Sequence, residues 1–232
     1  MCGRFTLTSS QEQIAKVLPG LVFDVPIDPR YNIAPTQSVA TVLNDERMSV
    51  SMVQWGLIPS WAKDRAIGNR MINARAETLA EKSSFKRPFK SQRCLILADG
   101  FYEWKQRPGK TGKTGKTPVY IYLRDHRPFA FAGLWDRWKS PDQKVVVSCT
   151  IITTEANEML VPIHSRMPVI IAPRYYEQWL APQDRPPESM ISCLQPIPSS
   201  SFALHEVSKQ VNRATFDDPV CIKPAESDRS FD

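Results

Sequence analysis

The sequence places a cysteine directly behind the initiator methionine, in the string Met-Cys-Gly-Arg-Phe. Because methionine aminopeptidases remove Met1 when the second residue is small, we expect the mature chain to start at Cys2. An α-amine and a thiol would then sit on adjacent carbon atoms. The amine, with a reference pKa of about 7.7 to 8.0, is partly neutral near pH 7 and can attack an aldehyde. The tethered thiol can then close onto the imine carbon, which predicts trapping of an aldehyde as a five-membered thiazolidine.

Six other short polar strings hold the remaining candidates for chemistry, namely RYNIAPTQ, WGLIPSW, MINARAET, ADGFYEWK, IHSRMP and VSKQVN. Taken singly, each has an ordinary explanation. Asn73 is explained as a helix cap, Glu103 as a surface strand residue and His164 as a hydrogen-bonded loop histidine. Only the whole set, in this order, favours a shared site.

Taken together, the strings resemble the SRAP family, named SOS response-associated peptidase. The resemblance rests on Met-Cys-Gly-Arg-Phe, Tyr-Asn-Ile-Ala-Pro, Ile-Asn-Ala-Arg-Ala-Glu, Asp-Gly-Phe-Tyr-Glu-Trp and a late His-x-Arg-x-Pro, and it runs from Met1 to about Asn212. It implies a single α+β domain, built mainly from an antiparallel, curved, barrel-like β-sheet with a few flanking helices. It also implies a protein that recognises abasic sites in single-stranded DNA and is crosslinked to them through its cysteine, without a cofactor or metal.

The resemblance assigns roles to particular residues. Cys2 would be the covalent nucleophile, Asn73 and Glu103 would flank it, and His164 would transfer protons. Phosphate contacts would come from Arg4, Arg75 and Arg166, and contacts to bases or sugar from Pro35, Trp61 and Trp104.

These residue types make chemical sense of the assignment. An abasic deoxyribose is mostly a closed hemiacetal, and only its open aldehyde reacts with amines. Glu103 suits the acid–base step that opens the ring if burial raises its pKa. Asn73 can orient the sugar or the amine without titrating, and His164 can carry protons near neutral pH. Unstacked single strands also suit aromatic and arginine contacts, whereas no recognition helix for base readout is present in the pattern.

Composition sets broader limits. A net charge of +6 permits an anionic partner, although a uniformly solvated basic surface gives the same sum. Five widely spaced cysteines without a Cys-x-x-Cys pair predict neither a disulfide framework nor a metal site. No run of about 18 apolar residues and no signal-peptide pattern is found. We therefore expect a cytoplasmic monomer, associated with the nucleoid if the source is bacterial, and no membrane partner.

The element pattern predicts one domain over 1–222 and a disordered tail over 223–232. A capping box of Ser9 and Glu12 predicts a short helix after it, and β-patterns predict a hairpin over 38–55. One strand over 93–105 is expected to pair with 117–124. Helices are expected over 74–85, 155–163 and 173–181. The string GKTGKTGKT, over 109–117, lacks the spacing of a phosphate-binding loop and predicts a basic hairpin tip instead.

Two other functions remain open. The first is a cysteine peptidase with Cys2 as nucleophile and His164 as base, whose activity includes the case of autoprocessing at Met1 alone. The second is a non-covalent reader of nucleic acid in which Cys2 is structural. Cys2→Ala separates these two functions from the crosslinking protein. It would abolish the crosslink of a crosslinking protein and the peptide cleavage of a peptidase, and it would change little in a non-covalent reader.

Overall fold

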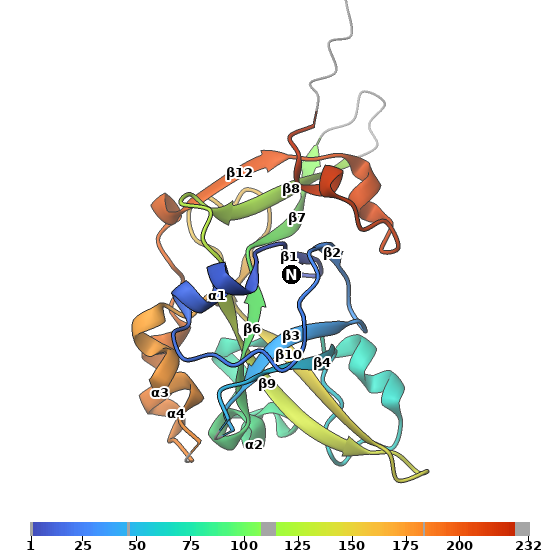
Figure 1. The fold of residues 1–232 in the computed structure, drawn as a ribbon, viewed down its shortest axis with the longest axis vertical. Coiled ribbons are helices and arrows are strands. Elements are labelled where there is room, and N and C mark those ends of the chain that lie inside the picture. Colours follow the sequence, from blue (N-terminus) through green and yellow to red (C-terminus); the bar gives the residue numbers. More distant parts are fainter. Residues whose placement is uncertain (1, 46, 108–114, 183, 226–232) are drawn as a thin grey trace, which may run out of the picture.

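The fold combines a closed β-barrel with a second β-sheet, and short helices flank the barrel (Figure 1). A computed structural model describes residues 2–45, 47–107, 115–182 and 184–225. The arrangement confirms the α+β class and the barrel-like, largely antiparallel sheet expected from the sequence.

Five strands form the barrel: β3 (Ser38–Leu43), β4 (Val50–Trp55), β6 (Arg93–Ala98), β9 (Phe129–Lys139) and β10 (Val145–Glu155). They follow the order β10-β4-β3-β6-β9, and β9 pairs back with β10 to close the ring. Closure depends on the length of β9, whose first half pairs with β6 and whose second half pairs with β10. The β4–β10 contact is parallel and the other pairings in the ring are antiparallel. A closed barrel leaves no unpaired strand edge within the ring.

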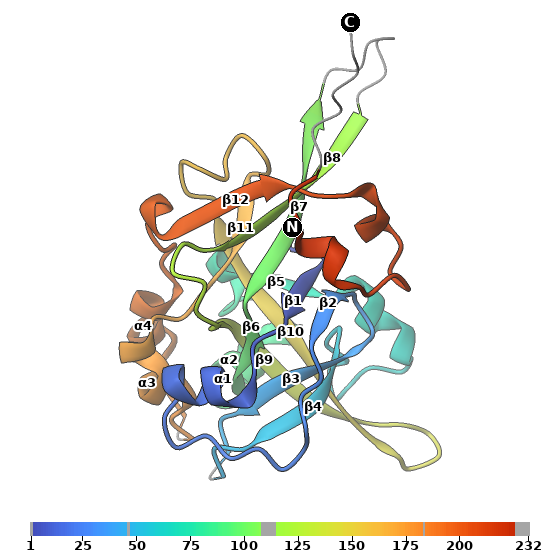
Figure 2. The same cartoon turned by 45° about the horizontal axis from the view of Figure 1, so that its top comes forward.

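The second sheet has the order β12-β8-β7-β1-β2 and contains β1 (Phe5–Leu7), β2 (Arg30–Ile33), β7 (Gly100–Arg107), β8 (Gly115–Leu123) and β12 (Phe202–Glu206). One face packs on the barrel, where the Phe5 ring lies 5.1 Å from that of Trp55 and the Phe101 ring lies 6.1 Å from that of Phe131. The opposite face, with Tyr102, is covered by the segment that follows β12. Figure 2 shows this C-terminal segment lying beside β7 and β2. The central part of the sheet is therefore buried on both faces, whereas the outer ends of β7 and β8 are exposed.

The helices are short. The α-helices are α1 (Gln11–Val17), α2 (Ser83–Ser91), α3 (Tyr176–Leu180) and α4 (Pro187–Met190). The 3-10 helices are η1 (Arg65–Arg70), η2 (Ala76–Thr78), η3 (Pro173–Tyr175), η4 (Ile191–Leu194), η5 (Ser199–Ser201), η6 (Lys209–Asn212) and η7 (Pro219–Ile222). Two short strands, β5 (Asn73–Arg75) and β11 (Arg166–Pro168), complete the fold. None of the helices in the described ranges is long and apolar enough to span a membrane.

Several sequence expectations are confirmed and several are wrong. The hairpin over 38–55 and the pairing of β7 with β8 are confirmed. The expected strand over 93–105 is broken at Asp99, so that β6 lies in the barrel and β7 in the other sheet. The capping box is shifted by one residue to Ser10 and Gln13, because the main-chain N–H and hydroxyl of Ser9 both donate to Asp99.

Of the three helices expected over 74–85, 155–163 and 173–181, only the last is confirmed. The range 74–85 holds part of β5, η2 and only the start of α2, because tertiary pairing of β5 with β10 overrides the local helical pattern. The range 155–163 forms turns, whereas 173–181 contains the expected helical segment as η3 and α3. The strand β2 lies within the Pro-rich string PIDPRYNIAPTQ. The tip 109–117 falls mostly outside the described residues, as does 226–232, while the Ala225 N–H donates to Glu206 O at 2.7 Å.

Candidate functional site

The C-terminal half of β10 extends beyond the barrel pairing and carries a short strand on each side. Residues Ile151–Thr153 pair in parallel with β5, and Thr153–Glu155 pair antiparallel with β11. Asn73 and Arg75 therefore flank β10 from one side and Arg166 flanks it from the other. Two strings that are about ninety residues apart in the sequence, MINARAET and IHSRMP, meet on this one strand.

Cys2 lies directly against β5. The Asn73 carboxamide donates through Nδ2 to the main-chain oxygen of Cys2 at 2.9 Å, and the Cys2 side chain is fully buried. The Cys2 thiol lies 3.9 Å from the main-chain oxygen of Arg4. The other amide atom of Asn73, Oδ1, is buried and accepts no hydrogen bond from any residue that the structure describes. An unsatisfied buried acceptor of this kind is costly, and it offers a position for a donor on a ligand.

Glu103 is the buried carboxyl of this region. It lies on β7 opposite Val119 and is 5% exposed. Burial raises the pKa of the Glu103 carboxyl, and nearby positive charge, including that of His164, opposes the shift. Burial also raises the pKa of the Cys2 thiol, and the Glu103 carboxylate raises it further. Glu103 therefore lies within electrostatic range of both Cys2 and His164, and Asn73 is joined to Cys2 by its hydrogen bond.

Asp99 anchors the start of the chain, and it was not singled out in the sequence. Its Oδ1 accepts from the Thr6 hydroxyl at 2.5 Å, and its Oδ2 accepts from the N–H groups of Thr8 and Ser9 at 2.5 and 2.8 Å. The hydroxyls of Thr8 and Ser9 donate to the same Oδ2 at 2.8 and 3.0 Å. The aspartate in the string ADGFYEWK, which follows an apolar run, could have indicated such an anchor. This carboxylate fixes β1, which starts three residues after Cys2.

Gly100 is required beside this anchor. A side-chain carbon there would lie 2.2 Å from the hydroxyl oxygen of Tyr120, which approaches the Thr6 hydroxyl at 3.1 Å. Glycine leaves room for that contact.

The three arginines that the resemblance assigned to phosphates differ in their surroundings. Arg4 donates through Nη1 to Asn32 Oδ1 at 2.7 Å and to Val211 O at 2.6 Å. Arg166 is 15% exposed and pairs with Glu77 through both of its terminal nitrogens. Arg75 is exposed, and it forms no ion pair with another described residue. Asn32 and Glu77 were both missed as partners, although each lies in one of the quoted strings.

The aromatic candidates also differ. Trp61 is 57% exposed, yet its loop is held on both sides, since Ser60 N donates to Asp136 at 2.9 Å and Trp138 Nε1 donates to Ala62 O at 2.7 Å. Trp104 is half-buried and donates through Nε1 to Asn212 Oδ1 at 2.7 Å.

Two glycines shape the loop that carries Trp61. Gly56 has a φ of +119°, and a side-chain carbon on it would lie 2.6 Å from the main-chain oxygen of Gly68.

Pro35, the remaining candidate for a contact to bases or sugar, is half-buried and follows β2. The structure therefore presents one exposed ring on an anchored loop and one ring partly covered by the C-terminal segment.

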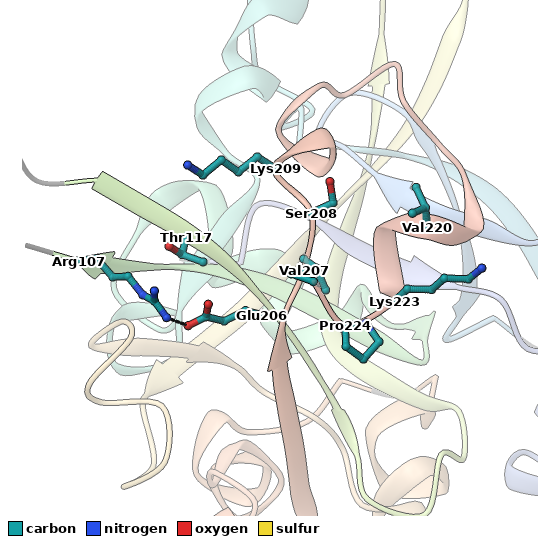
Figure 3. Close-up of a pocket in the computed structure, with 10 residues that line it drawn as sticks. Arg107, Thr117, Glu206, Val207, Ser208, Lys209, Val220, Lys223 and Pro224 are labelled. Atoms are coloured by element: carbon teal, nitrogen blue, oxygen red, sulfur yellow. Dashed lines mark hydrogen bonds and ion pairs between the residues drawn. The ribbon is translucent and has the colours of Figure 1, made fainter. Parts of the chain in front are cut away.

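A pocket of about 860 Å³ lies elsewhere, where the ends of β7, β8 and β12 meet the C-terminal segment (Figure 3). Its lining includes Lys209, Lys223 and an ion pair of Arg107 with Glu206, and none of the sequence-predicted site residues. We therefore place the candidate site around Cys2 and not in this pocket. Among the described residues, no group of three or more potential ligands is arranged for a metal ion.

Comparison with known proteins agrees with these motifs. The family model described as SOS response associated peptidase (SRAP) matches residues 1–214. The abasic site processing protein YoqW of Bacillus subtilis (strain 168) is 43% identical over 226 residues, which covers 96% of this chain and 99% of that protein. The abasic site processing protein HMCES of Gallus gallus is 34% identical, over 85% of this chain and 67% of its own length.

The fold has a counterpart among solved structures. A crystal structure of a protein from Bacteroides thetaiotaomicron superposes with a TM-score of 0.86 at 26% identity, covering 97% of this chain and 100% of that one. Family model, relatives and fold agree over nearly the whole sequence, and the chain therefore belongs to the SOS response-associated peptidase (SRAP) family.

Proposed function

We propose that this protein captures abasic sites in single-stranded DNA and, once Met1 is removed, forms a covalent thiazolidine with them through Cys2. The observation that carries the proposal is the hydrogen bond between Asn73 and the Cys2 main chain beside the buried carboxyl of Glu103. Relatives that are named abasic site processing proteins support the same substrate.

The first step opens the sugar. Burial keeps a proton on Glu103 at a higher pH than is usual for a carboxyl, so Glu103 can donate to the ring oxygen as the bond from that oxygen to C1′ breaks. His164 takes the proton from the C1′ hydroxyl, which becomes the aldehyde. Asn73 lies between the sugar and the amine of Cys2. Its Oδ1, which has no partner among the described residues, can accept a hydrogen bond from the sugar hydroxyl or from the amine.

The second step joins protein and DNA. The Cys2 amine adds to C1′, and loss of one water gives the iminium. Because the pKa of the Cys2 thiol is raised by burial, the sulfur stays protonated while the amine reacts. The sulfur then attacks C1′ and its proton passes to the Glu103 carboxylate. The sum is the combination of one aldehyde and one aminothiol with release of one water, and the order of events follows from the burial of the thiol.

DNA binding follows from the exposed groups. We assign the principal phosphate contact to Arg75, which is exposed, and stacking to Trp61 on its anchored loop. Arg4 and Arg166 contribute positive charge to the same region while their guanidinium groups bind Asn32 and Glu77. Trp104 and Pro35 complete the walls beside the lesion. No element for base readout is required, because the lesion itself is the recognised feature.

The setting and side reactions belong to the same proposal. A monomer in the cytoplasm, on the nucleoid in a bacterial cell, meets this substrate directly. The imine intermediate makes the neighbouring C2′ proton acidic, so a lyase reaction can compete with ring closure. Release of Met1 by the protein itself is the form of peptidase activity that the same site would support.

The decisive experiment uses protein whose mass confirms that it starts at Cys2. We expect a heat-stable adduct with single-stranded DNA that contains one abasic site, at the summed mass less one water, and none with intact DNA. Cys2→Ser keeps the amine and should yield only a borohydride-trapped imine, whereas Cys193→Ser removes a buried thiol elsewhere in the fold and should leave the adduct unchanged.

A protein starting at Cys2 that gives no heat-stable adduct overturns the proposal and leaves the non-covalent reader as the better account. Peptide cleavage that is lost with Cys2→Ala, without any adduct, favours the peptidase instead.

A further inference from the structure

An ion pair joins the two strings that flank β10. The Arg166 guanidinium forms a bidentate pair with Glu77, donating to Oε1 at 2.7 Å and to Oε2 at 2.9 Å. Its Nη2 also donates to the main-chain oxygen of Thr153 at 2.6 Å. The Glu77 side chain is 45% exposed and that of Arg166 is 15% exposed. Two parallel hydrogen bonds fix the plane of the guanidinium as well as its position.

The main chain of Arg166 in turn holds the ring of His164. The Arg166 N–H donates to His164 Nδ1 at 2.9 Å. Since a nitrogen that accepts this bond carries no proton, the neutral ring must have its proton on Nε2. The main-chain oxygen of Arg166 lies 3.2 Å from the same Nδ1, so a doubly protonated ring has an acceptor there with little movement. The ring can thus gain and lose a proton while it keeps one orientation.

We propose that Glu77 is a positioning residue for proton transfer: by clamping Arg166 it holds His164 with Nδ1 against the main chain and Nε2 presented to the reaction. The inference rests on the proposed function, because it names the nitrogen that exchanges the sugar proton. Glu77 touches neither sugar nor Cys2, and it acts through Arg166.

The clamp acts on a segment that has no regular helix or strand of its own before β11. β11 is three residues long, and the stretch that leads to it is made of turns. Its main-chain bonds include Ala156 N to Ser165 O at 3.1 Å and His164 N to Leu160 O at 2.9 Å, and the Asn157 side chain donates to Ile197 O at 3.1 Å. The Glu77 clamp adds a side-chain tie to a separate segment, η2. Orientation of a catalytic group by a second residue is how many sites keep a histidine in one tautomer.

Function and stability separate at this position. A pair whose carboxylate is nearly half exposed contributes little to folding, since water screens it and the side chains lose entropy. Glu77→Ala should therefore fold normally and change the ring alone. Glu81→Ala is the matched control, because Glu81 is an exposed carboxylate four residues further on, and no described residue forms an ion pair with it.

The test is nitrogen NMR of protein labelled in its three histidines, with His164 assigned by the loss of its signals in His164→Gln. In the neutral ring of His164, the wild type should show an unprotonated Nδ1 and a protonated Nε2. Glu77→Ala should show the two tautomers in exchange, with shifts averaged between them, and Glu81→Ala should match the wild type. A wild type protonated on Nδ1, or a Glu77→Ala spectrum identical to the wild type, overturns the proposal.

The second readout is the rate of adduct formation on abasic single-stranded DNA. We expect Glu77→Ala to be slower by about tenfold, since a modest loss of orientation at a reacting group has effects of this order or larger. Glu77→Gln, which keeps one acceptor, should lie between Glu77→Ala and the wild type. Wild-type rates in Glu77→Ala overturn the positioning role. Absence of any adduct in the wild type refutes the proposed function instead, and the NMR result still decides whether the clamp holds the ring.

Discussion

Replacing Asp99 with alanine should test whether a single carboxylate fixes the start of the chain. In the folded protein the two Asp99 oxygens accept from the Thr6 hydroxyl and from both N–H and hydroxyl of Thr8 and Ser9. The Asp99 N–H also donates to Thr6 O at 3.0 Å, and that bond survives any side-chain change. The variant therefore removes the side-chain anchor while it leaves the adjoining main-chain pairing in place.

The loss can be estimated from the donors left behind. The three hydroxyls can rotate toward other acceptors, whereas the N–H groups of Thr8 and Ser9 are fixed by the main chain. Each buried N–H without an acceptor costs about 1–3 kcal/mol, so Asp99→Ala should lower the free energy of unfolding by roughly 2–6 kcal/mol. Taking about 4 kcal/mol, the Tm of a chain of this length should fall by roughly 8–16 °C.

Asp99→Asn is the graded comparison. Its amide oxygen can occupy the Oδ2 position and keep both N–H donors, and its NH₂ can face the Thr6 hydroxyl, which can accept. We expect a loss of only about 1–2 kcal/mol, from the weaker hydrogen bonds of a neutral acceptor. Asp125→Ala is the control, because Asp125 is exposed and its ion pair with Arg127 should contribute less than about 1 kcal/mol.

The assay is urea or thermal unfolding of all three variants, followed by adduct formation at a temperature where each is folded. The expected order of stability is wild type, Asp99→Asn, Asp99→Ala, and the folded Asp99→Ala should crosslink more slowly because β1 no longer fixes the approach to Cys2. An Asp99→Ala protein that melts within about 2 °C of the wild type would show that the carboxylate anchors nothing, and the reasoning would fail.

Three further outcomes are expected. Asn73→Ala leaves the Cys2 main-chain oxygen without its donor, which costs about 1–3 kcal/mol. Adduct formation in a single-turnover assay should therefore slow by roughly 5- to 150-fold, and a smaller effect would contradict a direct role. Burial raises the pKa of Glu103, so the stability that its protonated carboxyl contributes is fully present below its ordinary pKa of about 4.3 and is lost as the pH rises through the raised folded-state pKa. Glu103→Gln should therefore be more stable than the wild type near pH 7, and this advantage should disappear below about pH 4 in thermal melts. Arg75→Ala should reduce the salt dependence of single-strand binding by about 0.7 in log–log slope, while Lys144→Ala, an exposed cation paired with Asp142, should not.

The sequence was a good guide to the strands. Apolar strand patterns predicted the hairpin of β3 and β4 and the pairing of β7 with β8, and β3, β7 and β8 each contain a run of consecutive buried residues. Cys2, Asn73 and His164 were found through short polar strings that local structure alone does not require. Their mutual placement depends on β10, and no local pattern shows that β5 and β11 pair with the same strand.

The failures have a common physical cause, which is competition from distant partners. Ser9 and Ser10 are both acceptable helix caps, and the choice between them is made by Asp99, ninety residues away, which takes the donors of Ser9. The range 74–85 has helix-forming residues, yet Ala74 lies in β5 because the main-chain bonds to β10 and burial in the core outweigh a propensity of a few tenths of a kcal/mol per residue.

The arginines show the same limit for electrostatics. A guanidinium in a polar string predicts a bound anion equally well whether that anion is a phosphate or a carboxylate of the same chain, because both accept two parallel hydrogen bonds. Arg166 is bound to Glu77 and Arg4 to Asn32, so their charge shapes the site from within the fold. Arg75 is exposed at the end of β5, two residues after Asn73, which contacts Cys2. It has no such hydrogen-bonding partner among the described residues. It is therefore the one of the three to which the proposed function assigns the principal phosphate contact.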